Sequence, residues 1–151
     1  MINLNEVAAG LSYVGSSVKK CNIDNNIISL GADAKYEMRL DFSTSILPQS
    51  VEEHLKRGRV LLNIRCDVTL EEVENVQTSI DFIIEGEFST STDTPDDKFN
   101  KMLMINGVSA LYGIARSKLE VITAMTYHDG KISFPMINVL ELLKQKEENP
   151  S

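Results

Sequence analysis

Residues 62–70, Leu-Asn-Ile-Arg-Cys-Asp-Val-Thr-Leu, alternate between apolar and polar side chains. A period of two is typical of a half-buried β-strand, because successive side chains of a strand point to opposite sides of its sheet. After a turn at 71–75, a second stretch places apolar side chains at Val76, Ile80, Phe82, Ile84 and Phe88. The two stretches predict an antiparallel hairpin, in which Asp81, Glu85 and Glu87 share the face away from the core.

Two further strands are expected before this hairpin. Tyr36, Met38, Leu40 and Phe42 share one face of the nearer strand. Residues 11–23 predict the other, with a bulge or kink at Gly15-Ser16-Ser17. Between them, Ile27, Ile28 and Leu30 belong to a segment that is too short and irregular for a strand. Residues 43–58, which contain Pro48, are expected to form a loop with one helical turn.

The period changes after the hairpin. Thr94 is an N-cap candidate, Pro95 suits the first helical position, and Asp96 and Asp97 suit the first turn of a helix. An apolar stripe at helical spacing follows, and a break at Asn106-Gly107 is expected to separate it from residues 99–105. The stripe comprises Val108, Leu111, Tyr112, Ala115, Leu119 and Ile122.

The C-terminal part predicts one more helix. Residues 127–130 form a turn, and Pro135 keeps its neighbours extended. Asn138, with Glu141 three residues later, caps a short helix through Leu143. We therefore expect one α+β domain over residues 1–146, with a frayed tail at 147–151. A four-stranded antiparallel sheet is followed by a long helix and a short C-terminal helix, packed on one side.

Charge, hydropathy and cysteine count disfavour several classes of function. The chain has 151 residues, 22 acidic against 15 basic side chains and a net charge of −7, which disfavours nucleic-acid binding. No apolar run is long enough to cross a bilayer, and the first residues have no basic and apolar leader, so no membrane insertion is expected. Cys21 and Cys66 form no disulfide framework. These features predict a cytoplasmic, reduced protein.

The acidic residues are concentrated in one region. Between Cys66 and Asp97 there are ten carboxylates and no lysine or arginine. Two interpretations remain open: a solvated strand face, or a docking surface for a basic partner. A calcium loop around Asp93, Asp96 and Asp97 is disfavoured because the glycine and glutamate of an EF-hand are missing.

Catalytic chemistry is not predicted. His54 lies in a mixed charged stretch and His128 in a glycine turn, and neither cysteine has a histidine close in sequence. No phosphate-binding glycine loop and no metal-ligand spacing of His and Cys occur, so no metal site and no cofactor are expected. A non-enzymatic binding protein remains.

The order of elements and five motifs together resemble the SecB protein-export chaperone and its SecB-like family, over nearly the whole chain. The motifs are Glu37-Met38-Arg39-Leu40-Asp41, residues 62–70, Glu85-Gly86-Glu87-Phe88, Ala110-Leu111-Tyr112 with Ala115-Arg116, and Phe134-Pro135-Met136-Ile137-Asn138. The resemblance implies a homotetramer, a dimer of dimers with the long helices between two sheets. It also implies an ATP-independent holdase that binds unfolded or partly folded client polypeptides, as in preprotein export.

The resemblance also implies two sites. The family's client-binding groove falls here on Ile27, Ile28, Leu30, Phe134, Met136 and Ile137. Ala34 replaces the family's tryptophan, which predicts a shallower, more aliphatic groove. The acidic face that contacts the SecA motor falls on Asp24 and Asp81, flanked by Glu85 and Glu87, whereas Lys20 replaces the third acid. Two alternatives therefore stay open: a SecB-like chaperone dedicated to one partner, such as an antitoxin, and a non-chaperone adaptor that binds through the acidic sheet face.

Overall fold

The computed structural model describes residues 1–4, 9–49 and 53–150. Within them, an antiparallel sheet has the strand order β1-β4-β3-β2. The strands are β1 (Ser12–Asn25), β2 (Ala34–Ile46), β3 (Leu55–Leu70) and β4 (Val73–Ser91). The helical elements are α2 (Asp96–Met102), the π-helical turn η1 (Leu103–Gly107), α3 (Val108–Thr126) and α4 (Val139–Glu148). The predicted α+β architecture is confirmed.

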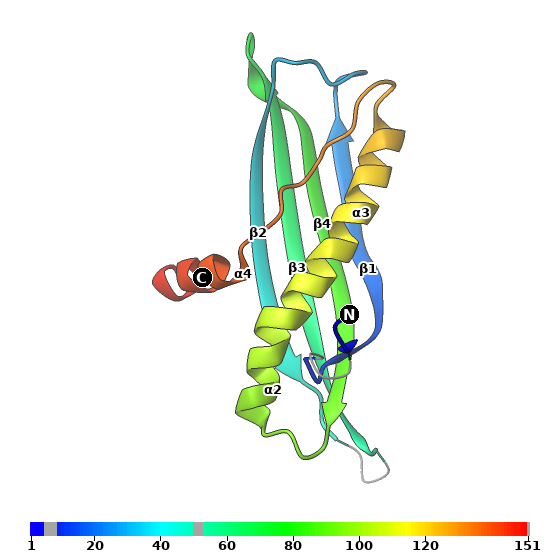
Figure 1. Ribbon diagram of the computed structural model, residues 1–151. Coiled ribbons are helices and arrows are strands. Elements are labelled where there is room, and N and C mark those ends of the chain that lie inside the picture. The colour runs from blue at the N-terminus through cyan, green and yellow to red at the C-terminus, as the bar shows by residue number, and fades with distance from the viewer. Residues whose placement is uncertain (5–8, 50–52, 151) are drawn as a thin grey trace.

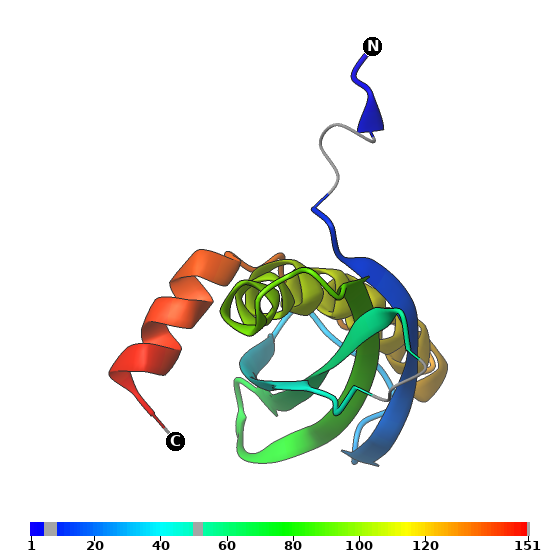
Figure 2. The same ribbon diagram turned by 90° about the horizontal axis from the view of Figure 1, so that it is seen from below.

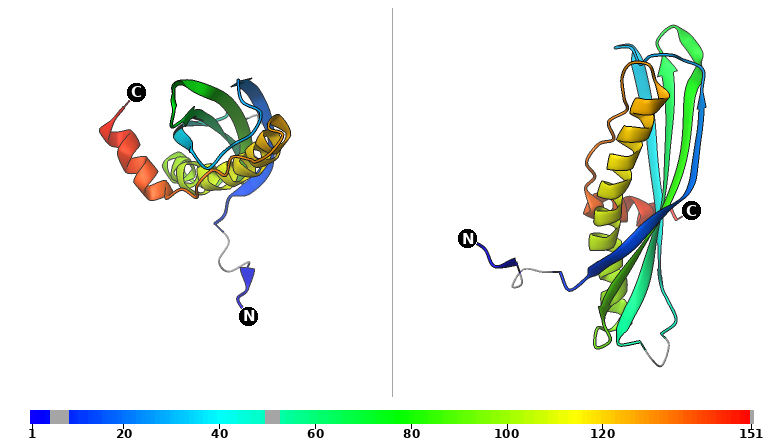
Figure 3. Two further views of the ribbon diagram at one scale, coloured as in Figure 1. Left: turned by 90° about the horizontal axis from the view of Figure 1, so that it is seen from above. Right: turned by 90° about the vertical axis from the view of Figure 1, so that its right-hand side faces the viewer.

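The long helical rod covers one face of the sheet. α2, η1 and α3 follow one another without a gap and cross that face diagonally (Figures 1 and 3). α4 lies to the side, beyond the β2 edge (Figure 2). The helical rod therefore forms the second layer of the domain, and α4 forms a separate flank.

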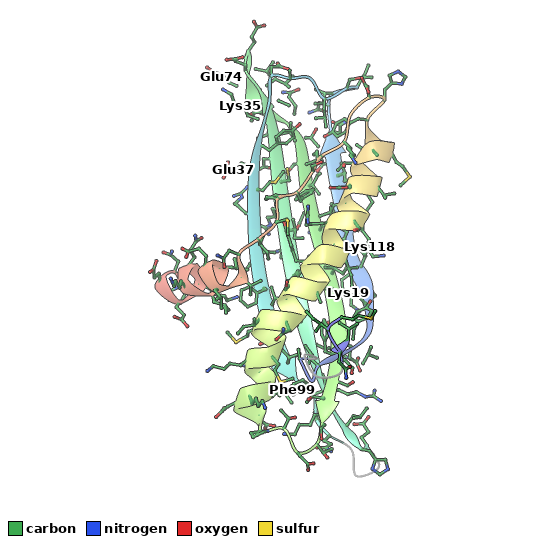
Figure 4. All side chains as sticks on the ribbon, in the orientation of Figure 1. Lys19, Lys35, Glu37, Glu74, Phe99 and Lys118 are labelled. Carbon is green, nitrogen blue, oxygen red and sulfur yellow. The ribbon has the colours of Figure 1, made fainter. Side chains whose placement is uncertain are left out.

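The core lies between the sheet and this rod. The register pairs Leu62 with Ile84 and Ile64 with Phe82, so these side chains share the helix-facing side, as the alternation predicts. All are buried, as is Phe99 of α2, which is labelled in Figure 4. Gly58 of β3 lets the rod approach closely, since a Cβ there would lie 2.5 Å from Leu103 Cδ1.

The hairpins are longer than the sequence predicts. Residues 43–46 belong to β2 and 55–58 to β3, so the loop expected over 43–58 is wrong at both ends. Register pairing continues to Ile46 and Gly58, because cross-strand hydrogen bonds override the weak strand propensity of serine. The rest of that loop includes residues 50–52, which lie outside the described residues. The β3–β4 turn is also shorter, because Val73 already pairs with Leu70.

The helix boundaries also differ from expectation. Asn106-Gly107 does not break the helix but lies in η1, so the chain absorbs the glycine in a π-helical turn. The first helix begins at Asp96, with Pro95 rather than Thr94 at the cap position. The Asn138 cap is confirmed by hydrogen bonds from the Leu140 and Glu141 N–H groups. The capped helix extends to Glu148, so the predicted end at Leu143 is wrong, and Glu147 and Glu148, which we assigned to the tail, are helical.

The predicted irregularity in the first strand is present. The β1–β4 register shifts between Tyr13 and Gly15 and again between Val18 and Lys20, on either side of the Gly-Ser-Ser sequence. Each shift lets the strand bend, and β1 curves around the edge of the sheet (Figure 3).

Candidate functional site

The crossover at residues 26–33 and the extended segment at residues 127–138 meet at one end of the sheet. The N–H of His128 donates to the carbonyl of Ile28 at 2.8 Å, and the N–H of Leu30 donates to the carbonyl of Asp129 at 3.1 Å. These bonds connect two segments that are about a hundred residues apart in sequence and that flank the end of α3 (Figure 1).

The extended segment then runs along α3, which holds it by three side-chain hydrogen bonds. The N–H of Ile132 donates to Thr123 Oγ1 at 3.0 Å. Arg116 Nε donates to the carbonyl of Phe134 at 2.9 Å, and the Tyr112 hydroxyl donates to the carbonyl of Pro135 at 2.6 Å. Because α3 satisfies these backbone groups, the segment stays extended without being part of the sheet.

The predicted groove residues differ in exposure. Ile28 and Met136 are 77% and 84% exposed, whereas Phe134 is only 2% exposed and belongs to the core. Ile27, Leu30 and Ile137 are half-buried against that core. Ile28 accepts a hydrogen bond from His128 at the start of the extended segment, and Met136 lies near its other end, three residues before α4. The structure therefore does not gather the six side chains into one open groove.

Sequence reasoning missed a contact between α4 and the β2 edge. Lys146 Nζ lies 2.8 Å from Asp41 Oδ1, donates to the carbonyl of Phe42, and lies 4.3 Å from the centroid of the Phe42 ring. The hydrogen bond from Lys146 lowers the pKa of Asp41, against a smaller opposing effect of burial. Nothing in the sequence indicates this pair, because its members are 105 residues apart.

Two clefts lie beside this contact. A cleft of about 340 Å³ lies between the β2 edge and α4, with Leu40 and Leu142 in its walls. A second cleft, of about 320 Å³, has Met104 and Leu143 in its walls. Phe42 and Lys146 border both clefts, so they separate one cleft from the other.

The outer face of the sheet carries the predicted acidic residues, but basic side chains accompany them. Asp81, Glu85 and Glu87 alternate along β4 and share the face opposite the helices, as predicted. The register sets three arginines of β3 beside them: Arg65 is 3.7 Å from Asp81, and Arg59 is 3.8 Å from both Glu85 and Glu87. Arg57 is 3.5 Å from Glu87.

Strand β1 adds two lysines to this face. Lys20 Nζ lies 2.5 Å from Asp81 Oδ2, and Lys19 lies 3.7 Å from Glu85. Asp24 is exposed further along β1, at the position that pairs with Ser79. The outer face therefore carries interleaved positively and negatively charged side chains rather than a continuous negative patch.

The remaining candidates for chemistry are dispersed. His54 and His128 are exposed; His54 directly precedes β3, and His128 follows the end of α3 by two residues. Burial raises the pKa of the Cys66 thiol to about 11. Across residues 1–4, 9–49 and 53–150, no group of three or more His, Cys, Asp or Glu side chains is placed to hold a metal ion. In the same residues, no helix has the length and apolar character to cross a membrane.

Comparison with known proteins identifies the fold through a solved structure and not through sequence similarity. No protein-family profile matches the chain, and no curated protein is similar to it in sequence. Among solved structures, it is similar to the Mycobacterium tuberculosis SecB-like chaperone Rv1957 in complex with a ChAD peptide from the antitoxin HigA1 (Rv1956). The TM-score is 0.63 at 11% sequence identity, over 89% of this chain and 95% of that one. The protein thus has a SecB-like fold.

Proposed function

We propose that this protein is an ATP-independent holdase of the SecB type, which binds unfolded or partly folded polypeptides in the cytoplasm. The observation that carries the proposal is the fold shared with a chaperone over 89% of the chain. Exposed apolar side chains support the proposal, because a holdase must present apolar surface that can repack around different clients. Met136, 84% exposed, lies just before α4; Leu140, 61% exposed, lies in its first turn, and Ile28 lies on the crossover.

Aggregation of a client provides the test. A chemically denatured client is diluted into buffer with and without the purified protein, and light scattering follows its aggregation. We expect suppression at near-stoichiometric amounts without ATP, because binding to the unfolded state removes it from aggregation by mass action. Unchanged light scattering by the client at a large molar excess of this protein would refute the proposal.

The crossover and the extended segment are proposed as two client-binding surfaces, and the same assay tests them. Ile28→Ser with Met136→Ser removes their two most exposed apolar side chains and should weaken suppression. Leu55→Ser is the matched control, since Leu55 is 50% exposed at the start of β3, outside both surfaces. Equal effects of the two variants would contradict this location.

We also propose a homotetramer in which the long helices of different copies meet. Val121 and Met125, at 59% and 75% exposure, lie one turn apart on α3, where a second copy would cover them. Light scattering should then give four times the chain mass of 16.8 kDa, about 67 kDa. A monomer would contradict the assembly.

A chaperone dedicated to one partner is the second candidate. The similar solved structure holds an antitoxin peptide, which favours this candidate. The two candidates differ in breadth: a general holdase suppresses aggregation of several unrelated clients, whereas a dedicated chaperone protects one.

The outer face carries a separate proposal for a folded partner. Asp24, Asp81, Glu85 and Glu87 would contact a basic surface, such as one on the SecA motor or the partner of an adaptor protein. Because arginines and lysines already pair with three of these carboxylates, such a partner must displace them. Neutralising Asp81, Glu85 and Glu87 should abolish a salt-sensitive complex. A complex that survives the triple substitution would exclude this face.

A further inference from the structure

The crossover at residues 26–33 begins beside a chain of hydrogen bonds between three side chains. The Tyr127 hydroxyl donates to Thr78 Oγ1 at 2.8 Å, and the Thr78 hydroxyl donates to Asn25 Oδ1 at 2.7 Å. Tyr127 directly follows α3, Thr78 lies in β4, and Asn25 is the last residue of β1. The ends of these elements meet at one end of the sheet (Figure 1). We call the three side chains the crossover network.

The hydrogen bonds of the crossover network have a defined direction. Thr78 is fully buried and Tyr127 is 4% exposed, so both hydroxyls are shielded from water. Burial also raises the pKa of Tyr127, so at neutral pH its phenol keeps the proton that it donates. Because Tyr127 donates to Thr78, the single hydroxyl proton of Thr78 is directed to Asn25. The side-chain oxygen of Asn25, and not its nitrogen, therefore faces Thr78.

The orientation of the Asn25 amide fixes the start of the crossover. Asn25 Nδ2 donates to the carbonyl of Ile27 at 2.6 Å, and Asn25 Oδ1 accepts from the N–H of Ile27 at 3.3 Å. One amide thus holds both backbone groups of Ile27, which the same amide turned by about 180° could not do. Beside it, the N–H of Asn26 donates to the carbonyl of Gln77 at 2.8 Å.

The next residue, Ile28, is exposed although its backbone is held in place. The carbonyl of Ile28 accepts from the N–H of His128, and the N–H of Leu30 donates to the carbonyl of Asp129. The Ile28 side chain is nevertheless 77% exposed. Apolar side chains are withdrawn from water where the backbone is free to move. Backbone hydrogen bonds on both sides of Ile28 therefore keep an apolar side chain on the surface.

Resting on the proposed function, we propose that Asn25, Thr78 and Tyr127 are positioning residues for client binding, because the crossover network holds the crossover in the conformation in which Ile28 contacts an apolar side chain of an unfolded client. The client then meets a surface that is already ordered, so binding loses less free energy to the ordering of the crossover. Thr78 and Tyr127 act through Ile28 and do not touch the client, since both are buried.

Thr78→Val tests the proposal, because valine has nearly the shape of threonine but lacks the hydroxyl. The Asn25 amide loses the donor that orients it, and only a fraction of the molecules then present Ile28. The affinity for a fluorescently labelled unfolded client, measured by anisotropy, should fall about fivefold. Thr78→Ser keeps the hydroxyl and should restore most of the affinity. Tyr127→Phe, which removes only the first donor, should give a smaller loss in the same direction and serves if Thr78→Val does not fold.

Thr90→Val is the matched control. Thr90 is buried further along β4, and its hydroxyl donates to the carbonyl of Gly10 at 2.9 Å. Both valine substitutions remove a buried hydrogen bond, so both should lower the free energy of unfolding, but only Thr78→Val should weaken client binding. Equal losses of affinity in the two variants would show that affinity follows general stability and would overturn the proposal.

Amide hydrogen exchange without a client gives a readout that loss of stability alone does not move. In Thr78→Val, the N–H groups of Ile27, Leu30 and His128 should lose most of their protection, while that of Ile64 in β3 should keep it. In Thr90→Val all four should stay protected. Unchanged exchange at the three crossover bonds in Thr78→Val would overturn the proposal.

A double-mutant cycle shows whether the crossover network acts through Ile28. Ile28→Ser should weaken client binding, and adding Thr78→Val should weaken it no further, because the side chain that Thr78 positions is already gone. Losses that multiply would overturn the positioning role. Normal client binding by Thr78→Val alone would also overturn that role but leave the proposed holdase intact, whereas failure of the unaltered protein to bind any unfolded client would overturn both.

Discussion

The hydroxyl of Tyr112 on α3 donates a 2.6 Å hydrogen bond to the carbonyl of Pro135. Tyr112 is 5% exposed, so this bond joins the extended segment to the long helix at a site nearly closed to water. It is the last of the bonds that hold the segment before α4 begins, and it therefore fixes where Met136 and α4 start.

Tyr112→Phe tests this attachment. The variant leaves the Pro135 carbonyl without its donor, which should lower the free energy of unfolding by about 1–3 kcal/mol. Urea denaturation measures the loss, and faster hydrogen exchange at residues 136 and 137 would locate it. Tyr13→Phe is the control, since the Tyr13 hydroxyl bonds to Ser16 at an exposed position and its loss should cost little. A similar cost for both variants would argue against the attachment.

Close packing of the helical rod on β3 gives a second prediction. Gly58→Ala places a methyl group 2.5 Å from Leu103 Cδ1, in a fully buried contact, and should destabilise the protein by about 1–3 kcal/mol. Gly113→Ala provides the opposite case, because a Cβ there meets nothing within 4 Å. On an exposed helical position it should stabilise by about 0.5–1 kcal/mol. Thermal unfolding of the two variants should thus shift in opposite directions, and shifts in the same direction would refute the packing.

The two thiols should differ in reactivity. Cys66 is fully buried, and burial raises its pKa to about 11, whereas Cys21 is exposed on β1. Because the thiolate is the reactive form, a disulfide reagent at neutral pH should modify one thiol per chain quickly and the other only on unfolding. Cys21→Ser should remove the fast reaction and Cys66→Ser should leave it. Two fast thiols in the folded protein would contradict the buried position of Cys66.

The Asp41–Lys146 pair should respond to acid. The hydrogen bond from Lys146 holds the pKa of Asp41 below its ordinary value of 3.8. A folded-state pKa below the unfolded value means that the pair stabilises the fold fully above about pH 3.8 and loses this contribution as pH falls through the lower folded value. Carbon NMR titration of the Asp41 carboxyl should show a higher pKa in Lys146→Met than in the unaltered protein. Identical titrations would show that the pair does not form.

The strand pattern could be predicted from the sequence because burial on one face imposes a period of two. Leu62, Ile64 and Cys66 all face the core as expected. Helix positions followed from the stripe that includes Leu111 and Leu119. Boundaries were less predictable, since residues 43–46 and 55–58 became strands through pairing with each other rather than through their own propensity.

The site was harder to predict because it depends on contacts between distant residues. The stretch 66–97 contains no basic residue, which suggested an acidic face, yet the register sets Arg57, Arg59 and Arg65 of β3 directly beside its carboxylates. Phe134 was a groove candidate, but its alternation with Ile132 along the extended segment buries both. The contact of Lys146 with Asp41 and Phe42 needs α4 beside β2, and no local pattern specifies that position.

Preferential binding of an unfolded chain is the claim on which the rest depends. A client that can be held either folded or permanently unfolded, for example by reduction and alkylation of its disulfides, is labelled with a fluorophore and titrated with this protein while anisotropy is recorded. We expect saturable binding of the unfolded form in the absence of ATP and much weaker binding of the folded form. Equal affinity for the two forms, or no binding of the unfolded one, would contradict it.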